Sequence, residues 1–549
     1  MILHSAEKIA QYTQAGYWGQ ETLLDRFSAH VERHPERMAV VDPPDREDLV
    51  GSAPQRLDWK SLGQAVRNMT AALQRLGVGK DDVVVAQVPN VWELAALYLA
   101  VAQAGGVLSP LPLQWREKDV DYVRTLTGSR YFIAPERFKD YAQAELGRRV
   151  GFEHVVTLEE VADWARTPGQ PQPVPVDAND VFTLCWTSGT EAEPKGCPLT
   201  HNNWFFMSGM LVRTCHVQEG DRILAVAPMV NMTAVGVNYI PWLLQGGTLY
   251  LHHPLNVEVL LRQLVEEKIQ FTILVPAMLL MILKLPNVDS LDLSAVRTIT
   301  TGSAPPSPWA MQEFKRRWGI EIVNIWGQNE GTGLVAGPDD VPDLNLRSDH
   351  FPWWGKPGIE WPSGIRGIEV KILDDEGNAL TAPGQIGELC FRSPGVFPGY
   401  FNRPDLTAKA FTEEGFFRTG DLFVIHDERH VGFHDRKKDI VIRGGFNIST
   451  AEVENAVLGH PKVLEAAVVP APDEILGERV CAFVVPRNPQ DPPTLEEIVA
   501  FLREKGMSVY KLPERLELIE AIPRNPVGKI VKHRLRQELR KRLNPGENE

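Results

Sequence analysis

The chain has 549 residues, 43% of them hydrophobic and 23% charged, which is typical of a soluble multidomain protein and excludes collagen-like, low-complexity and disordered classes. It carries 57 Lys and Arg against 71 Asp and Glu, and the net charge of -14 disfavours a nucleic-acid partner. The five cysteines are scattered without CxxC or zinc-ligand spacing, so we expect a reducing, cytoplasmic location.

The beginning of the chain predicts neither export nor a membrane anchor. Residues 1–8 lack a basic region followed by an apolar run, which a secretory signal needs. The most apolar stretch, residues 94–113, follows Glu93 and contains two glycines and two prolines. These breaks predict a buried helix followed by a strand, and no integral membrane span is expected.

Short apolar segments alternate with helical patterns along most of the chain. The predicted strands are residues 83–88, 181–186, 223–227, 271–275 and 321–325, and residues 62–76 show helical spacing. This alternation is typical of βαβ units. We therefore predict the α/β class, with a large N-terminal domain of mostly parallel sheets and helices over residues 1–435.

The C-terminal part has a different pattern. From about residue 384 the sequence is Gly-rich with hairpin-like strands, which predicts a β-rich subdomain, and residues 436–549 are predicted to form a small α+β domain. In that domain Thr494 and Glu497 have the spacing of a capping box at the start of a helix. Residues 465–469 and 480–485 are predicted strands of the same domain.

The segment after the strand at 181–186 carries hydroxyls, glycines and a cation. It begins with Thr187, Ser188, Gly189 and Thr190, and Lys195 lies near its end. Flexible backbone N–H donors and one ammonium group are what a polyphosphate needs. The segment is not a GxxxxGK[ST] P-loop, and its two glutamates would repel phosphate, so an ordinary polar loop is an equal alternative for this segment alone.

Two further segments place polar side chains at turns. Residues 326–330, Trp-Gly-Gln-Asn-Glu, follow the strand at 321–325, and there an aromatic ring can pack on a purine and Glu330 can bind Mg²⁺ beside phosphates. Residues 419–421, Thr-Gly-Asp, place Asp421 where it could accept both ribose hydroxyl protons. Each segment alone is also compatible with an ordinary loop.

Two basic segments complete the pattern, residues 435–447 and residues 523–530, which contain Lys529. In this order and at these separations the five segments resemble the adenylate-forming (AMP-binding) superfamily of acyl- and aryl-CoA ligases, peptide-synthetase adenylation domains and firefly luciferase. The resemblance covers roughly residues 20–540 and includes residues 228–231 at the family's acyl pocket loop.

This resemblance implies an enzyme that uses ATP, Mg²⁺ and coenzyme A. Lys529, Glu330 and Thr190 are expected to act in catalysis, Glu330 as the Mg²⁺ ligand and Lys529 as the cation between the acid and the α-phosphate. Residues 436–549 are expected to rotate about Lys438 between two half-reactions. The nucleotide and coenzyme A are expected to contact Thr187, Ser188, Gly189, Thr190, Lys195, Gly302, Ser303, Ala304, Trp326, Gly327, Gln328, Asp421, Arg436 and Gly445, and the acid to contact Asn231, Met232, Val235, Gly302 and Gly327.

Four positions depart from the family pattern. Ala192 stands where relatives usually carry Gly, Asn329 where they carry Thr, Asn231 where most carry His, and Thr450 where they carry Pro. None of these changes removes a charged catalytic group. Asn231 bears on the acid pocket, and a shift of one residue would align it with the Asn that contacts a 2-hydroxyl in salicylate-type activators.

We therefore expect an acid–thiol ligase that forms an acyl-adenylate and transfers the acyl group to coenzyme A, releasing AMP and pyrophosphate. Residues 227–237 contain no acidic side chain, so an apolar aliphatic, alicyclic or aromatic acid is expected rather than an amino acid. Two alternatives stay open. One is an adenylation enzyme that loads a carrier-protein phosphopantetheine, and the other is a nucleotide-binding regulator without catalysis.

Overall fold

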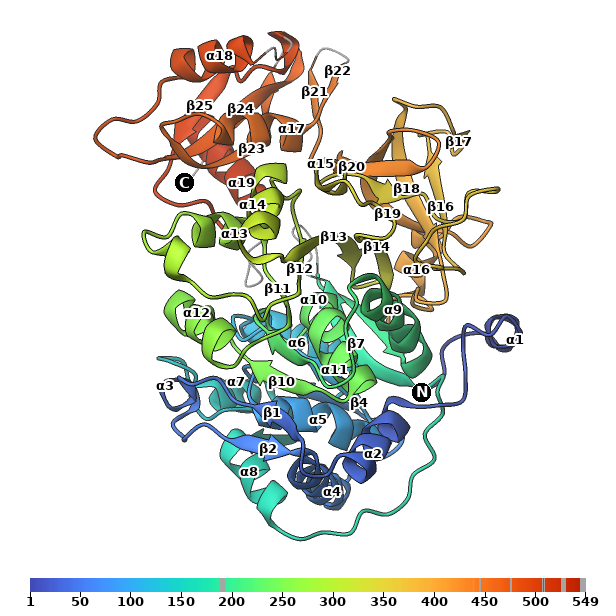
Figure 1. Cartoon of the computed structure of the whole chain (residues 1–549). Coiled ribbons are helices and arrows are strands. Elements are labelled where there is room, and N and C mark those ends of the chain that lie inside the picture. The colour runs from blue at the N-terminus through green and yellow to red at the C-terminus, as the bar shows by residue number, and fades with distance from the viewer. Residues whose placement is uncertain are drawn as a thin grey trace. The chain divides into compact units, whose positions relative to one another are not determined.

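The structure, a computed structural model, describes residues 1–187, 193–437, 439–443, 446–473, 476–505, 507, 509–524 and 530–543. These residues form two compact units (Figure 1). The first contains the described residues up to Val370 together with Phe391–Phe417. The second contains Lys371–Cys390 and the described residues from Arg418 onward.

One sheet of the first unit has the strand order β14-β13-β12-β11-β9-β10-β1-β2. Its neighbouring strands are parallel except at the β13–β14 and β1–β2 pairs, which are antiparallel. The strands are β1 (Met38–Val41), β2 (Arg56–Asp58), β9 (Arg222–Ala225), β10 (Thr248–Leu251), β11 (Phe271–Ile273), β12 (Thr298–Gly302), β13 (Glu321–Gln328) and β14 (Thr332–Ala336).

A second sheet of this unit has the order β6-β5-β3-β4-β7-β8 and is parallel except at β7–β8. All residues of β3 and β5 are buried, as expected for parallel strands covered by helices on both faces. The strands are β3 (Val83–Ala86), β4 (Val107–Pro110), β5 (Tyr131–Ala134), β6 (His154–Thr157), β7 (Val181–Thr187) and β8 (Lys195–Thr200).

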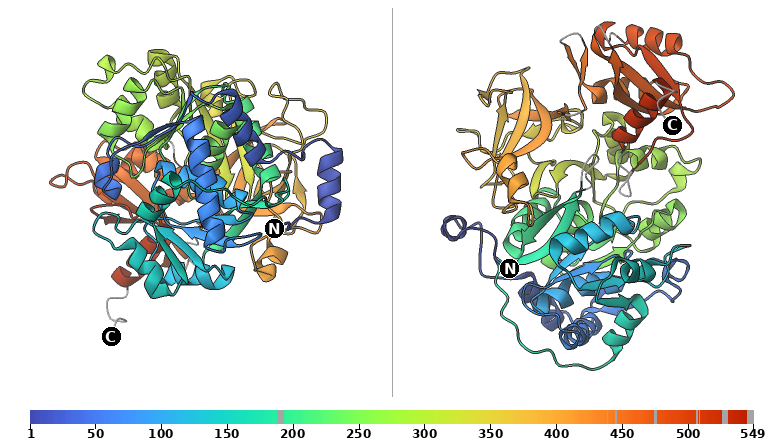
Figure 2. Two further views of the ribbon diagram at one scale, coloured as in Figure 1. Left: turned by 90° about the horizontal axis from the view of Figure 1, so that it is seen from below. Right: turned by 180° about the vertical axis from the view of Figure 1, so that it is seen from behind.

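Helices lie on the faces of both sheets (Figures 1 and 2). α5 (Trp92–Gln103) is apolar on all sides and contacts β1 of the first sheet and β4 and β7 of the second, so it is buried between them. The other helices of this unit are α1 (Ala6–Gln14), α2 (Leu23–Arg33), α3 (Arg46–Val50), α4 (Trp59–Arg75), α6 (Glu117–Thr127), α7 (Gln143–Val150), α8 (Leu158–Arg166), α9 (His201–Thr214), α10 (Met232–Ala234), a π-helix (Val235–Tyr239), α11 (Ile240–Gln245), α12 (Val257–Glu266), α13 (Pro276–Leu283), α14 (Pro308–Trp318), α15 (Leu344–Arg347) and α16 (Pro404–Ala410), with a short strand β15 (Phe351–Pro352) and a 3₁₀ turn at Val288–Ser290.

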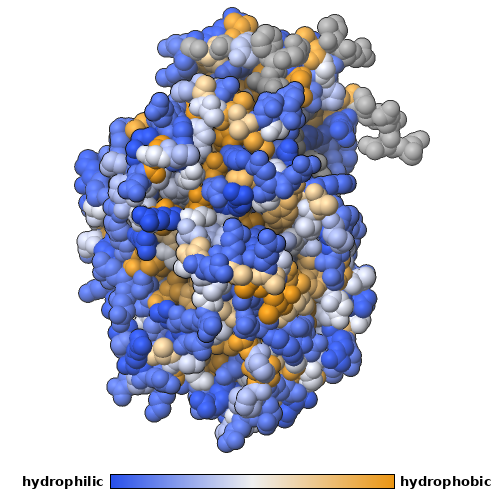
Figure 3. Space-filling model, turned by 90° about the vertical axis from the view of Figure 1, so that its right-hand side faces the viewer, coloured by the Kyte–Doolittle hydropathy of each residue, from blue (hydrophilic) through white to orange (hydrophobic). Residues whose placement is uncertain are grey.

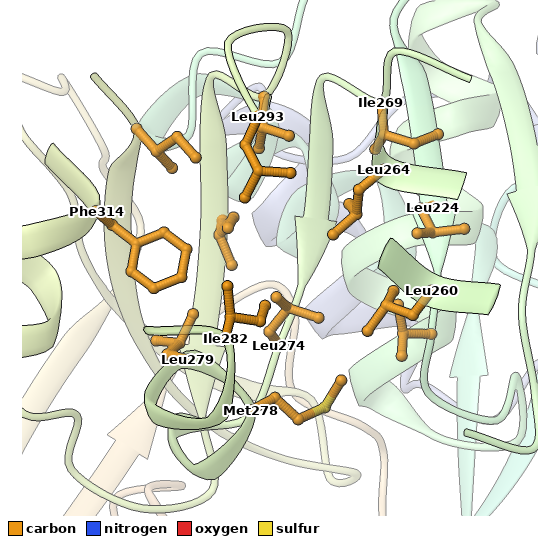
Figure 4. Packing of buried hydrophobic residues seen from close by; sticks show 14 of the residues in the cluster. Leu224, Leu260, Leu264, Ile269, Leu274, Met278, Leu279, Ile282, Leu293 and Phe314 are labelled. Atoms are coloured by element: carbon orange, nitrogen blue, oxygen red, sulfur yellow. The ribbon is translucent and has the colours of Figure 1, made fainter. Parts of the chain in front are cut away.

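The core beneath the β9–β13 part of the first sheet is a mainly aliphatic cluster that also contains Phe314, Tyr250 and two methionines (Figure 4). Leu260 of α12, Ile282 of α13 and Phe314 of α14 pack with Leu224 of β9 and Ile299 of β12, and all five are fully buried. Full burial of such a side chain stabilises the fold by about 1.5–3 kcal/mol. This packing makes the edge of the sheet a rigid support for the loops that follow its strands.

The second unit holds two further sheets. In the first of these, β20, β19, β18, β16 and β17 are neighbours in that order. In the other, β22-β21-β24-β23 is the order and β25 adds in parallel to β24. The elements are β16 (Glu369–Leu373), β17 (Ala379–Leu380), β18 (Ile386–Arg392), β19 (Phe417–Ile425), β20 (His430–Arg436), β21 (Val441–Arg443), β22 (Phe446–Ile448), α17 (Thr450–Leu458), β23 (Val463–Asp473), β24 (Gly477–Pro486), α18 (Leu495–Glu504), a 3₁₀ turn (Val509–Lys511), β25 (Arg515–Leu518) and α19 (Lys532–Leu543).

The long strand β23 separates two small cores. Ala466 and Val468 belong to a cluster with residues of α17 and α18, whereas Ala467 and Val469 belong to a cluster with residues of α19. This alternation follows from the period of two in a β-strand. The predicted capping box is present, because Thr494 accepts from the Glu497 N–H while the Glu497 side chain accepts from the Thr494 N–H.

The predicted fold class is confirmed by these elements. The mostly parallel sheets with helices, the β-rich part and the smaller α+β part are all present, and residues 94–113 form helix α5 followed by strand β4 as predicted. The predicted strands at 465–469 and 480–485 lie within β23 and β24. The boundary between residues 435 and 436 stays a prediction.

On the face shown in Figure 3 hydrophilic side chains predominate, with smaller hydrophobic areas between them. Among the residues that the structure describes, no helix combines the length and hydrophobicity needed to cross a bilayer.

Candidate active site

Two parallel strands of the first unit lie side by side at the edge that carries several predicted site residues. The second strand, β13, continues to Gln328 and pairs with β14 there, so the strand predicted to end at residue 325 is three residues longer. β12 and β13 pair up to Gly302 and Ile325. A Cβ on Gly302 would lie 2.6 Å from the Ile325 carbonyl oxygen, so the strands approach too closely for a larger residue. The chain then turns at Ser303, which is exposed and has a φ of 75°. This edge brings together the predicted residues Gly302, Ser303, Ala304, Trp326, Gly327 and Gln328, in the position where α/β sheets bind ligands.

The turn between β13 and β14 is fixed by a distant segment of the same unit. Gly331 has a φ of 85°, and a Cβ there would lie 2.0 Å from the Gly395 carbonyl oxygen. The Phe397 N–H donates to the Glu330 carbonyl oxygen at 2.9 Å. Glu330 itself is only 6% exposed. The backbone of Glu330, the residue predicted to bind Mg²⁺, is therefore held by contacts with residues 395–397, which the segment 326–330 alone does not predict.

The Glu330 side chain is joined to Lys195 through a tyrosine. The Tyr400 hydroxyl donates to Glu330 Oε1 at 2.8 Å, and Lys195 Nζ donates to the Tyr400 hydroxyl at 3.1 Å. The Lys195 ammonium also lies 4.4 Å from the centroid of the Tyr400 ring. Burial, together with the neighbouring Glu330 carboxylate, raises the pKa of Tyr400, so its hydroxyl stays protonated and can donate.

Lys195 and Thr187 mark the two ends of the predicted phosphate loop. They are paired across the antiparallel strands β7 and β8, and the Lys195 N–H donates to Thr187 Oγ1 at 3.4 Å. The loop therefore begins and ends at one point of the sheet. Other predicted site residues, Ser188, Gly189, Thr190, Lys438, Gly445 and Lys529, and the departure Ala192, lie outside the described residues.

Buried polar side chains hold the predicted acid-pocket loop against α5. The Asn90 amide donates to the Ala227 carbonyl oxygen at 2.8 Å and accepts from the Met229 N–H at 2.9 Å. The Tyr98 hydroxyl donates to the Met229 carbonyl oxygen at 2.7 Å. The buried side chains of Asn90 and Tyr98 thus hold the backbone of this loop in place without a ligand.

Asn231 begins the helical segment that follows this loop. Its Oδ1 accepts from the Thr233 N–H at 3.0 Å, so the side chain caps α10, and neighbouring Met232 is partly buried. The structure thus gives Asn231 a backbone role that the sequence did not predict, and its contact with the acid stays a prediction. Val235, the third predicted pocket residue, is fully buried.

Residues Val235–Tyr239 form a π-helix, a feature often found at functional sites. Pro241 has no N–H to donate to a carbonyl of the preceding turn. The Ser208 hydroxyl of α9 instead donates to the Gly236 carbonyl oxygen at 2.9 Å. A side chain of α9 therefore supplies a hydrogen bond to a backbone carbonyl of the π-helix beside the predicted pocket.

In the second unit the structure brings Asp421 and Arg436 together. They are cross-strand partners on β19 and β20, and Arg436 Nε lies 3.7 Å from Asp421 Oδ1. Asp421 is 5% exposed, and its N–H donates to Thr419 Oγ1 at 3.1 Å. Gly420, between them, has a φ of 70° that favours glycine. The arrangement fits the predicted ribose and nucleotide contacts, which remain predictions.

The departure at Thr450 has a clear structural role. Its hydroxyl donates to Asp435 Oδ2 at 2.8 Å and accepts from Lys532 Nζ at 2.6 Å. Lys532 also pairs with Glu454 at 2.8 Å, and this partner opposes the rise that burial causes in the pKa of Glu454. Proline at position 450 could form none of these bonds. Thr450 thus ties the end of β20 to the start of α19, on either side of α17.

The residues that the sequence interpretation missed are Tyr400, Asn90 and Tyr98. Each reaches the site across a long sequence separation, 70 residues from Tyr400 to Glu330 and 139 from Asn90 to Met229. No periodicity or spacing in the sequence marks them. Asn329, which stands where relatives usually carry Thr, marks an unusual position beside Glu330, but the sequence does not predict which groups its side chain bonds.

The described donors fit a Mg²⁺ ion held together with phosphates. Mg²⁺ is usually bound by one or two carboxylates plus substrate phosphate oxygens and water. Glu330 supplies one carboxylate, which accepts from the Tyr400 hydroxyl, while the Phe397 N–H holds the backbone carbonyl of the same residue. Lys195, at the end of the phosphate loop, supplies a nearby positive charge for the same anion.

Comparison with known proteins matches the chain to one enzyme family. The AMP-binding enzyme model matches residues 27–401, and the model of the AMP-binding enzyme C-terminal domain matches residues 452–529. The medium-chain fatty-acid–CoA ligase of Escherichia coli is 29% identical over 558 residues, covering 99% of this chain and 94% of that protein. The 2,3-dihydroxybenzoate-AMP ligase of Bacillus subtilis is 27% identical over 548 residues, covering 97% of each.

Among solved structures, ATP-bound MatB from Rhodopseudomonas palustris matches with a TM-score of 0.80 at 24% identity, covering 94% of this chain and 99% of that chain. At this identity the likeness establishes the fold. The resemblance predicted from the motifs is confirmed by the family models, which together span both parts of the chain. The chain belongs to the AMP-binding enzyme family of adenylate-forming ligases.

Proposed function

We propose that the protein is an ATP-dependent acid–thiol ligase that converts an apolar carboxylic acid to an acyl-adenylate and transfers the acyl group to coenzyme A. In the first step a carboxylate oxygen attacks the α-phosphorus and pyrophosphate leaves. In the second step the thiol sulfur attacks the acyl carbon and AMP leaves. The observation that carries the proposal is the bonded set Lys195, Tyr400 and Glu330 at the ends of the phosphate loop and of β13.

The charge balance of the first step explains the residues assigned to it. A carboxylate approaching a triphosphate brings anions together, so cations must offset both charges. Lys195 lies at the phosphate loop, and we assign Lys529 to the acid and the α-phosphate. Mg²⁺ held at Glu330 would withdraw charge from the phosphate oxygens. Asp421 and Arg436 are assigned to the ribose and nucleotide.

The proposed acid is apolar because of the loop that lines its pocket. Residues 227–237 contain no acidic side chain, and an α-ammonium group buried without a counter-charge costs several kcal/mol. Asn90 and Tyr98 hold this loop through backbone atoms and so do not offer that counter-charge. Small to medium aliphatic, alicyclic or aromatic acids fit such a lining.

Two half-reactions in one chain require that the first site be emptied before the thiol enters. We assign this change to rotation of residues 436–549 about Lys438, which withdraws Lys529 and brings the loop at Gly445 to the pantetheine arm. Domains of residues 1–435 and 436–549 are part of this proposal.

The second candidate function is loading of an acyl or aryl group onto a carrier-protein phosphopantetheine. The similarity to the 2,3-dihydroxybenzoate-AMP ligase favours it, and the similarity to the medium-chain fatty-acid–CoA ligase favours coenzyme A. Both acceptors present the same thiol arm, so the adenylation site is common to the two.

The test is a pyrophosphate-release screen of carboxylic acids with saturating ATP and Mg²⁺, including octanoate, cyclohexanecarboxylate, benzoate, salicylate and a set of α-amino acids. We expect release with one or more apolar acids and none with amino acids. AMP release is then followed after adding coenzyme A or a phosphopantetheinyl carrier protein. Absence of acid-dependent release with every acid would refute the function, and thioester on the carrier alone would establish the second candidate.

A further inference from the structure

Asn329 lies at the turn after β13 and bonds to two backbone segments of the first unit. Its Oδ1 accepts from the Met232 N–H at 2.9 Å, and its Nδ2 donates to the Trp186 carbonyl oxygen at 2.8 Å. The two partners fix the orientation of the amide, because an N–H partner requires the oxygen and a carbonyl partner requires the nitrogen. The bonds span 97 and 143 residues of sequence.

One of these partners belongs to the base of the phosphate loop. Trp186 is the next-to-last residue of β7 and precedes Thr187, where the loop begins. Trp186 is 4% exposed, and its Nε1 donates to Ser109 Oγ at 2.8 Å. The side chain of Trp186 is thus fixed by the second sheet, and its carbonyl oxygen is fixed by Asn329.

The other partner belongs to the acid-pocket segment. Met232 is the first residue of α10, and the chain continues directly into the π-helix and α11. First-turn N–H groups have no partner within their own helix. Asn231 Oδ1 takes the Thr233 N–H, and Asn329 Oδ1 takes the Met232 N–H. The two asparagines together cap the start of this segment.

Asn329 also precedes Glu330, whose carboxylate is bonded through Tyr400 to Lys195. The same turn is therefore connected to both ends of the phosphate loop and to the acid pocket. We propose that Asn329 is a positioning residue that ties the acid-pocket helix to the base of the phosphate loop, so that both substrates are held in one geometry. The assignment of the two segments to acid and phosphate rests on the proposed function.

Two variants separate the two bonds. Leucine has a volume similar to that of asparagine, and the Asn329→Leu variant removes both hydrogen bonds. Asn329→Asp keeps an oxygen for the Met232 N–H but puts a second oxygen against the Trp186 carbonyl, so it keeps one bond and loses the other. Asn324→Leu is the matched control, because Asn324 lies on β13, just before the turn that holds Asn329, and its Nδ2 also donates to a backbone carbonyl, that of Ser348, at 2.8 Å.

The first measurement is amide hydrogen exchange of peptides that cover Met232, which needs no substrate. Asn329→Leu should accelerate exchange at the start of α10, Asn329→Asp should restore it to near the wild-type rate, and Asn324→Leu should leave it unchanged. A neutral hydrogen bond of this kind changes a local opening equilibrium by about 3- to 10-fold.

The second measurement is the affinity for the analogue α,β-methylene-ATP. It should fall about 3- to 10-fold in both Asn329 variants, with a larger loss in Asp because of charge repulsion, and stay near wild type in Asn324→Leu. In turnover with an acid that the screen identifies, Asn329→Leu should raise KM for acid and for ATP, whereas Asn329→Asp should raise KM for ATP alone.

Unchanged exchange at Met232 in Asn329→Leu, or failure of Asn329→Asp to restore it, would overturn the positioning role, as would unaltered analogue affinity in both variants. A wild-type protein that binds the analogue but activates no acid would refute the proposed function instead. In that case the exchange and affinity results would still decide whether Asn329 links the two segments.

Discussion

Replacing Tyr400 by Phe tests the bonded set at the phosphate loop with a change of one oxygen atom. The hydroxyl is 2.8 Å from Glu330 Oε1, and a hydrogen bond to an ionised group contributes about 1.5–3 kcal/mol, equivalent to roughly 10- to 150-fold in an equilibrium or rate constant. The ring contacts with Phe397 at 4.9 Å and with the Lys195 ammonium at 4.4 Å remain in the variant. We expect kcat/KM for ATP to fall about 10- to 100-fold, with overall folding preserved.

Acid-dependent exchange of labelled pyrophosphate into ATP measures this step, and circular dichroism melting checks the fold. Tyr131→Phe is the control, because Tyr131 is also buried and its hydroxyl also bonds a cation, Arg130, at 2.7 Å. It should leave the exchange rate unchanged. If Tyr400→Phe stays within about threefold of wild type, or if Tyr131→Phe loses as much, the hydroxyl does not orient Glu330 and Lys195 for the reaction.

The remaining predictions concern charge, ribose contact and the second unit. Removing the divalent cation with EDTA, or replacing Glu330 by Gln, should lower pyrophosphate exchange about 100-fold or more, and full exchange in EDTA would contradict the Mg²⁺ assignment. Asp421→Ala should raise KM for ATP about 10-fold because a nucleotide contact is lost, and an unchanged KM would remove Asp421 from the site. Lys529→Ala should stop adenylation yet still form thioester from synthetic acyl-adenylate and coenzyme A, and equal loss of both steps would refute alternating sites. Thr450→Val loses the bonds to Asp435 and Lys532, so it should destabilise the second unit by about 2–3 kcal/mol, seen as faster hydrogen exchange in α17 and α19, and protection equal to wild type would count against this role.

Local chemistry made several elements predictable from the sequence. The Thr494 and Glu497 capping box depends on residues three apart, and the buried helix and strand at 94–113 depend on a continuous apolar run broken by glycines. Gly302 ends β12, and Trp326 lies on the neighbouring parallel strand β13 just beyond its predicted end, although that strand continues to Gln328. Such features need only neighbours in the chain, so their physical cause is visible in a short segment.

Other parts of the site depend on side chains that packing brings from far away. Nothing near Tyr400 in the sequence indicates that its hydroxyl reaches Lys195, 205 residues earlier, because that contact requires both strands of β7–β8 and the turn after β13 to be in place. The sequence likewise does not indicate that the oxygen of Asn231 caps α10, and its predicted contact with the acid stays a prediction.

Asn329 shows which properties of the site are determined by the sequence alone and which are determined only by the tertiary structure. The sequence alone established the family, the fold class and an unusual residue beside Glu330, because motif order and spacing are preserved along the chain. Only the tertiary structure decided that the Asn329 amide joins Trp186 to Met232. A hydrogen bond requires two groups within about 3 Å and in line, and for residues 97 and 143 positions apart that geometry is the product of the whole packed core.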